Sequence, residues 1–131
     1  MMIAKMVKDF LIINCIGKDD KLGLRINKDF FTKKIENKTN SEKLVYEILK
    51  FLENHKVILN KSFSVLVNQG PGSFSGLRIS IAIAKGLHIS KKVKLYGFKC
   101  SNLASFNLEN IEKLLKNNLL EKKLIIPIYL S

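Results

Sequence analysis

The segment Val65–Ile89, VLVNQGPGSFSGLRISIAIAKGLHI, constrains the fold of this chain more than any other part. In it, an apolar strand-like run passes through a glycine-rich turn directly into a helix that is apolar or small on nearly every side. A buried strand followed at once by a helix is the unit from which parallel α/β sheets are built. A helix that is apolar all round must be covered on two sides. The segment therefore predicts an α/β fold in which a long helix is packed between other elements.

Three extended segments precede this unit in the chain. Phe10–Ile16 is a continuous apolar run typical of a buried central strand, Leu22–Asn27 alternates between apolar and polar residues, and Asp29–Glu36 is more polar. Turn residues separate the first two segments. The pattern predicts a meander of three antiparallel strands whose last strand lies toward the sheet edge.

Helices and strands then alternate. Thr39 and Glu42 have the spacing of a capping box and open a first helix with a wide apolar stripe. The following predicted elements are a strand at Phe63–Gln69, a helix to about Ser90, a strand at Val93–Phe98, a helical pattern over Leu103–Leu120 and a final extended KLIIPIYLS. This order predicts a mixed α/β sheet in which the strands after the first helix are parallel.

The length of 131 residues corresponds to one domain. We expect a single lobe over residues 1–131, with a core over about 9–107 and a short C-terminal helix and terminal strand over 108–131. The chain shows no apolar run of the roughly 18 residues needed to cross a bilayer and no signal-peptide pattern. Cys15 and Cys100 lie far apart in or beside apolar segments, which is typical of reduced thiols. These observations predict a cytoplasmic protein without a membrane partner.

The net charge of +12 raises the question of nucleic-acid binding. All but two of the 23 basic residues are lysines, which are solvated point charges and do not fork onto phosphates as arginine does. No aromatic residues interleave with the lysines as an RNA-binding signature would require. A generic lysine-rich surface is therefore favoured over an autonomous RNA-binding module, and RNA met as part of a complex fits either case.

The glycine turn has the form of a phosphate-binding loop. Its glycines relax the backbone, and the start of the next helix offers unpaired amides to an anion. The candidate anion-binding residues are Gly70, Gly72, Ser73, Ser75 and Arg78. A Walker loop would end in Gly-Lys-Ser/Thr, whereas this one continues Gly-Leu-Arg. A phosphate site and a tight turn that serves packing stay open as alternatives.

Acid–base chemistry is missing around this turn. No Asp or Glu occurs between Glu53 and Glu109, so the turn has no nearby carboxylate to hold magnesium or move a proton. Neither His55 nor His88 has a second metal ligand at suitable spacing. We therefore assign no catalytic residue, no metal site and no cofactor. A small nucleotide-binding enzyme that uses the turn from Gly70 to Arg78 is the alternative function.

The helix after the turn carries two rows of small residues at a spacing of four. One row is Gly76, Ser80 and Ala84, and the other is Ala82, Gly86 and Ser90. Small residues allow two helices to approach closely. Few elements of so short a chain are left to cover the second side of this helix, which predicts another subunit there. The alternative is that the first helix or the C-terminal helix covers it.

The residues GPGSFSGLRISIAIAKGL strongly resemble the GPGSFTGLR-type signature of the bacterial TsaB (YeaZ) family. The resemblance extends to Phe10–Ile16 and to Leu95–Ser105, and the terminal PIYLS is similar to that family's Pro-x-Tyr-Leu-Arg ending, with Ser131 in place of arginine. It implies the ribonuclease H-like lobe of the actin-like/Hsp70-like ATPase fold. The chain looks like a shortened member that lacks most of the second lobe.

The resemblance also implies a role in making threonylcarbamoyladenosine (t6A) next to the anticodon of tRNA. In that family the chain would be a noncatalytic subunit that binds and stabilises a TsaD-type transferase, with a TsaE-type ATPase in the assembly and tRNA met only as part of the complex. Pairing would use the helices Ser41–Asn54 and Ser75–Ser90, and the same helices could pair two copies of this chain. The expected partner-binding residues are Leu44, Ile48, Gly76, Leu77, Ser80, Ile83, Ala84 and Leu87.

Two departures from the family pattern concern chemistry. Asn14-Cys15 stands where relatives carry Asp-Thr in the first strand, which removes a carboxylate from the place of a nucleotide–metal site. Asn40-Ser41 stands where relatives carry a histidine early in the first helix. The replaced carboxylate weakens a nucleotide–metal role and leaves the predicted partner helices in place.

Overall fold

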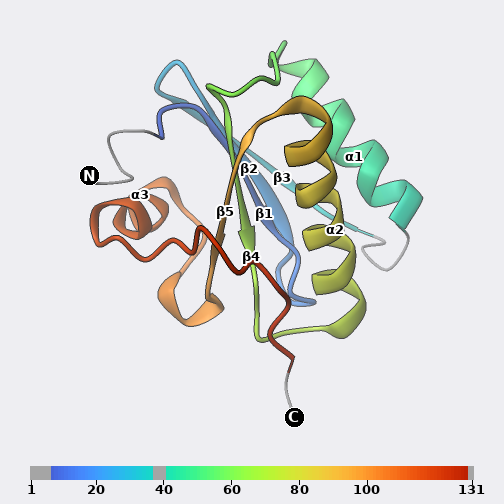
Figure 1. Ribbon diagram of the computed structural model, residues 1–131, viewed down its shortest axis with the longest axis vertical. Coiled ribbons are helices and arrows are strands. Elements are labelled where there is room, and N and C mark those ends of the chain that lie inside the picture. The colour runs from blue at the N-terminus through green and yellow to red at the C-terminus, as the bar shows by residue number, and fades with distance from the viewer. Residues whose placement is uncertain (1–6, 37–40, 130–131) are drawn as a thin grey trace.

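The computed structural model describes residues 7–36 and 41–129 and contains one five-stranded mixed sheet (Figure 1). The strands lie in the order β3-β2-β1-β4-β5. β1 is antiparallel to β2, and β2 to β3, whereas β1–β4 and β4–β5 are parallel. The strands are β1 (Phe10–Asn14), β2 (Lys21–Ile26), β3 (Asp29–Lys34), β4 (Ser64–Asn68) and β5 (Lys94–Phe98). The predicted α/β lobe, with three antiparallel strands followed by parallel ones, is confirmed.

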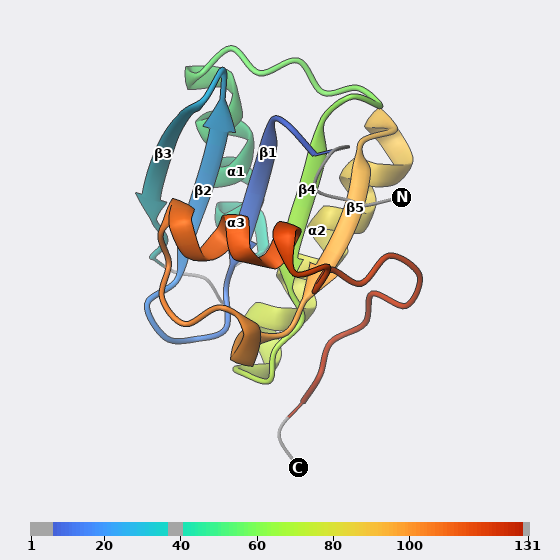
Figure 2. The same ribbon diagram turned by 90° about the vertical axis from the view of Figure 1, so that its left-hand side faces the viewer.

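Helices cover both faces of this sheet. α1 (Ser41–Asn54) and α2 (Phe74–Lys91) lie on one face, and α3 (Leu108–Lys116) crosses the other (Figure 2). Strand side chains alternate between the two faces. Leu11 and Ile13 of β1 therefore belong to the core under α1 and α2, and Phe10 and Ile12 to the core under α3. Burial on both faces explains why residues 10–13 of β1 and 65–67 of β4 are continuous apolar runs rather than alternating.

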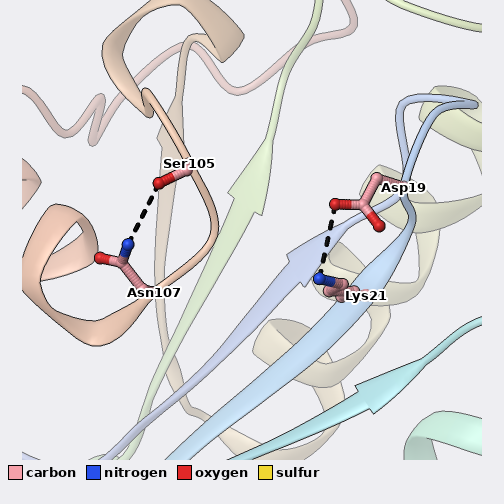
Figure 3. A network of polar contacts seen from close by, with 4 residues as sticks. All are labelled: Asp19, Lys21, Ser105 and Asn107. Atoms are coloured by element: carbon pink, nitrogen blue, oxygen red, sulfur yellow. Dashed lines mark hydrogen bonds and ion pairs between the residues drawn. The ribbon is translucent and has the colours of Figure 1, made fainter.

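The C-terminal helix is shorter than the sequence pattern predicts. A 3-10 turn, η2 (Cys100–Asn102), comes just before the predicted span Leu103–Leu120, and α3 occupies only nine residues of that span. Asn107 has an extended backbone and caps α3, because its Oδ1 accepts the N–H of Asn110 at 2.8 Å. Its Nδ2 donates to Ser105 Oγ at 3.1 Å (Figure 3). Side chains that bond the local backbone in this way favour turns and caps over helix interiors, which explains the late start of α3.

Other boundaries differ by one or two residues. β1 ends at Asn14, and α2 begins at Phe74 with Ser73 as its N-cap residue, although the Ser73 side chain makes no capping hydrogen bond. The predicted capping box at Thr39 lies outside the described residues. Cys15 is buried and Cys100 is half-buried. Within residues 7–36 and 41–129, no helix is long and apolar enough to cross a membrane.

The end of the described chain, residues 121–129, forms a strap beside α2 and β5 (Figures 1 and 2). Glu121 exchanges two backbone hydrogen bonds with Gly97 of β5, at 2.7 and 2.8 Å. Gln69 Nε2 donates to the carbonyls of Leu124 and Ile126, at 3.2 and 3.1 Å. These bonds fix the C-terminal strap to the carboxyl ends of the parallel strands, beside the glycine turn.

Candidate functional site

The glycine turn begins at a pair of buried asparagines. Asn14 is the last residue of β1 and Asn68 the last residue of the neighbouring strand β4. Asn68 Nδ2 donates to Asn14 Oδ1 at 2.7 Å. Asn68 Oδ1 accepts the N–H of Gly70 at 2.8 Å. The amides thus satisfy each other and the backbone, as buried polar groups require.

The turn itself packs against the β1–β2 loop. Ser73 N–H donates to the carbonyl of Ile16 at 2.6 Å, and Gly70 carbonyl accepts from Cys100 N–H at 2.7 Å. A Cβ on Gly72 would lie 2.6 Å from the Ile16 carbonyl, so only glycine allows this approach. Because the amides of Gly70 and Ser73 are already bonded within the protein, the geometry favours the packing alternative for this turn.

Three of the predicted anion-binding residues, Ser73, Ser75 and Arg78, lie at or just after the N-terminus of α2. Ser73 and Arg78 are exposed and Ser75 is half-buried, whereas Gly70 is buried. Among the described residues, no three His, Cys, Asp or Glu side chains gather in a group that could hold a metal ion. Anion binding by Gly70, Gly72, Ser73, Ser75 and Arg78 stays a prediction, with fewer available donors than the sequence suggests.

The predicted partner-binding row of α2 faces the wrong way for a partner. Ser80, Ala84 and Leu77 are each 0% exposed in the single chain, and Gly76 and Leu87 are also buried. On α1, Leu44 and Ile48 are buried as well. The prediction that these seven residues bind another subunit is therefore wrong, and of the predicted set only Ile83 is partly exposed.

The physical reason is a close approach between α2 and the sheet. A Cβ on Gly76 would lie 2.9 Å from the carbonyl oxygen of Cys15. The Ser80 hydroxyl donates to the carbonyl of Leu77 at 3.2 Å, so it is satisfied within the helix. The first row of small residues thus seats α2 on its own sheet, as in the alternative left open by the sequence, although the covering element is the sheet together with α1.

The second row of small residues lies on the opposite, outer side of α2. Ala82, Gly86 and Ser90 are exposed, and no heavy atom lies within 4 Å of a Cβ built on Gly86. On the neighbouring α1, Val45 is 36% and Leu49 47% exposed. We call the set Val45, Leu49, Ile79, Ala82, Ile83 and Gly86 the outer helix face.

This outer helix face is hollowed. A groove of about 770 Å³ runs over α2 from α1 to the C-terminal strap. Ser41 and Val45 line it from α1, and Pro127 and Tyr129 from the strap. α2 contributes Ser75, Arg78, Ile79, Ile81, Ala82, Ile83 and Lys85. Most of the lining is apolar, with cationic side chains at Arg78 and Lys85.

Part of this face carried a sequence signal. Val45 and Leu49 belong to the apolar stripe of α1, and Ala82 and Gly86 to the second small-residue row. Pro127 and Tyr129 belong to the family-like ending PIYLS, but the sequence does not place that ending beside α2, because their contact joins segments distant in sequence. The sequence thus identifies the helices but not which side of each is free.

A comparison with protein families matches residues 34–105 to the family described as TsaD, tRNA N6-adenosine threonylcarbamoyltransferase. These 72 of 131 residues, counted from the printed limits, are more than half of the chain. The match contains α1, β4, the glycine turn, α2 and β5, and so includes both helices of the outer helix face.

Two curated relatives are similar to shorter parts of the chain. The tRNA threonylcarbamoyladenosine biosynthesis protein TsaB of Buchnera aphidicola subsp. Schizaphis graminum is 40% identical over 60 residues, 46% of this chain and 29% of the relative. TsaB of Buchnera aphidicola subsp. Baizongia pistaciae is 46% identical over 46 residues, 35% of this chain and 20% of the relative. The chain thus matches less than a third of the length of these relatives.

Solved structures support the fold. YeaZ from Pseudomonas aeruginosa superposes with a TM-score of 0.62 at 18% identity, covering 75% of this chain and 45% of that one. A second Pseudomonas aeruginosa structure, described as similar to peptidase YEAZ, gives 0.63 at 18% identity with the same coverage. The lobe is shared with these proteins.

Proposed function

This chain belongs to the TsaD family of tRNA N6-adenosine threonylcarbamoyltransferases, as a TsaB/YeaZ-type member, and we propose that it is a noncatalytic subunit that binds a TsaD-type transferase in t6A synthesis on tRNA. In this proposal, a TsaE-type ATPase joins the assembly, and the modified adenosine lies next to the anticodon.

The outer helix face carries the proposal. It places exposed aliphatic side chains of α1 beside exposed small residues of α2, over a groove of about 770 Å³. Contiguous exposed apolar surface of this kind marks a protein interaction site. A related lobe with two such helices is the simplest partner, because small residues let opposing helices approach closely. The sequence resemblance implies pairing through the same two helices.

The noncatalytic role is supported by the chemistry of the glycine turn. The amides of Gly70 and Ser73 are bonded within the protein, and Asn14 stands in the first strand where a carboxylate would be needed for a nucleotide–metal site. No carboxylate lies between Glu53 and Glu109 in the sequence. Transfer chemistry is therefore assigned to the partner, and this subunit positions and stabilises it.

Ala82→Arg tests the pairing surface. Ala82 is exposed, so the arginine leaves the free subunit folded but places an uncompensated charge in the centre of the proposed interface. We expect affinity for a co-expressed TsaD-type transferase to fall at least about 100-fold, which corresponds to roughly 2.7 kcal/mol. Ala104→Arg, at an exposed position outside the outer helix face, is the matched control.

Co-purification and titration calorimetry with the transferase measure the effect. Equal affinity of the Ala82→Arg and Ala104→Arg variants would contradict the proposed surface. Failure of the unchanged chain to bind the transferase while it self-associates through this face would assign the face to a homodimer instead.

A further inference from the structure

A second hollow lies at the far end of α2, where the helix, β5 and the C-terminal strap meet. It has a volume of about 500 Å³. Its walls are Lys85, His88 and Ile89 from α2, Lys94, Leu95 and Tyr96 from β5, and residues 122–126 from the strap. We call it the lysine groove, because four lysines, Lys85, Lys94, Lys122 and Lys123, line it.

No carboxylate lines this groove, although eleven acidic residues occur in the chain. The four lysines form no ion pair within 4 Å with any carboxylate of the described residues. Lys21, by contrast, lies 3.4 Å from Asp19 (Figure 3), and Lys33 lies 3.1 Å from Glu47. The groove therefore concentrates positive charge.

Glu121, which precedes the groove residues in the strap and interacts electrostatically with Lys123, is held by the strap itself. Glu121 Oε1 accepts the N–H groups of Lys123 and Leu124, at 2.9 and 3.1 Å. Tyr96 in the groove floor is buried, and this burial raises the pKa of its phenol, so the floor adds no negative charge at neutral pH. His88 Nδ1 lies 2.6 Å from the carbonyl of Val93, which fixes the ring at the groove rim.

We propose that the lysine groove binds the phosphate backbone of RNA. Lysines drawn from three separate elements suit a chain of phosphates better than one small anion, and such contacts supply most sequence-independent affinity for nucleic acids. Leu95, Leu124 and Ile126 offer aliphatic surface but no exposed aromatic ring for base stacking. The groove therefore positions RNA without reading its sequence.

An acidic peptide is the competing occupant for such charge, and the edge of β5 disfavours it. Peptides commonly bind beside a sheet by adding a strand to its open edge. Here Glu121 already pairs with both backbone groups of Gly97, so a strand cannot run along the whole of β5. A phosphate backbone needs no such edge.

The position of the lysine groove suggests a role for RNA binding in the assembly, and this role rests on the proposed function. Lys85 lines both the lysine groove and the groove of the outer helix face. RNA held here would thus run beside the subunit bound to that face. In the assembly proposed above, the RNA is the tRNA substrate, and this subunit contributes to holding it near the transferase.

A charge-matched pair of variants of the full chain tests the proposal. The first replaces Lys85, Lys94, Lys122 and Lys123 by Gln, and the second replaces the exposed Lys8, Lys34, Lys50 and Lys61 by Gln. Both lose the same net charge, so a general electrostatic effect weakens both equally. Binding of labelled unmodified bulk tRNA is followed by fluorescence anisotropy over a range of salt concentrations.

We expect the groove variant to bind tRNA at least about tenfold more weakly than the control variant, with a shallower dependence on salt. Equal affinities of the two variants, or no binding by the unchanged chain, would overturn the proposal. Polyglutamate that binds the unchanged chain as tightly as RNA of equal charge would also overturn it in favour of an acidic protein segment. Co-purification of both variants with the TsaD-type transferase tests the proposed function separately. Variants that bind the transferase but not tRNA would leave the proposed function intact.

Discussion

The two rows of small residues on α2 have the same spacing and opposite surroundings. Gly76, Ser80 and Ala84 are buried against the sheet and α1, whereas Ala82, Gly86 and Ser90 are exposed on the outer side of α2. A small residue allows close approach of whatever lies opposite, and the pattern does not say whether that is the chain's own sheet or another molecule. The comparison therefore separates residues that build the lobe from residues free to bind a partner.

Substituting arginine for serine in each row should give the largest difference. Ser80→Arg places a charge in a fully buried position, which should destabilise the fold by about 3–5 kcal/mol. Ser90→Arg lies on the exposed row, where substitutions usually change stability by less than about 0.5 kcal/mol. Urea denaturation followed by circular dichroism measures both. Similar losses of stability would show that the two rows are not different in burial.

A matched pair of leucines extends the comparison to α1. Leu44 is buried and Leu49 is 47% exposed. Leu44→Ala should lower the free energy of unfolding by about 2–4 kcal/mol through cavity formation, whereas Leu49→Ala should cost under about 1 kcal/mol. Affinity for the TsaD-type transferase should be lowered by Leu49→Ala. Transferase binding that is unaffected by Leu49→Ala would remove α1 from the proposed surface.

The two glycines of the rows should respond to alanine with opposite signs. Gly86 lies in a helix with open space around it, so Gly86→Ala should raise stability by about 0.5–1 kcal/mol. Gly76→Ala brings a Cβ to 2.9 Å from the Cys15 carbonyl and should lower stability. Thermal melts of both variants measure the signs. A stabilising Gly76→Ala would contradict the close seating of α2 on the sheet.

The smallest effect concerns the C-terminal strap, whose Pro127 and Tyr129 line one groove with Ala82 of the outer row. The N–H groups of Leu124 and Lys123 hold the pKa of the Glu121 carboxyl below its ordinary value of 4.5. A lowered folded-state pKa contributes stability above that ordinary value, and the contribution is lost as the pH falls from 4.5 through the lowered pKa. Glu121→Gln should remove this acid-dependent part while the core stays folded.

Thermal melts of the unchanged chain and the Glu121→Gln variant, recorded over a range of pH values, measure this difference. The two curves should converge below the lowered pKa and separate above 4.5. Identical curves across that window would show that the carboxylate does not hold the strap.

The sequence predicts the sheet well because its strands are marked by local pattern. The apolar runs at β1 and β4 and the alternation at β2 identify buried and half-buried strands without knowledge of their neighbours. The C-terminal helix was predicted too long, because the apolar spacing of Leu103 and Leu120 continues through residues that cap and turn.

The candidate site was predicted less well than the fold. α1 and α2, the helices expected to bind a partner, lie beside one another, but the residues assigned to the interface are buried on their inner sides. A helix that is apolar nearly all round shows no polar face in its sequence, so the pattern does not distinguish its inner side from its outer side. The inner side is distinguished by tertiary structure, through the close approach of Gly76 to Cys15 and the burial of Ser80 and Ala84. The lysine groove could not be predicted either, since its lysines converge from α2, β5 and the strap.

Cysteine accessibility at position 82 tests the central claim most directly. Cys100→Ser removes the half-buried thiol, and Ala82→Cys then places a reporter on the outer helix face, with Ala104→Cys as the control position. Both reporters should react quickly with maleimide in the free subunit. With the TsaD-type transferase bound, the reporter at position 82 should be protected at least about tenfold while the one at position 104 stays reactive. Undiminished reactivity at position 82 in a complex shown to be intact would contradict the account.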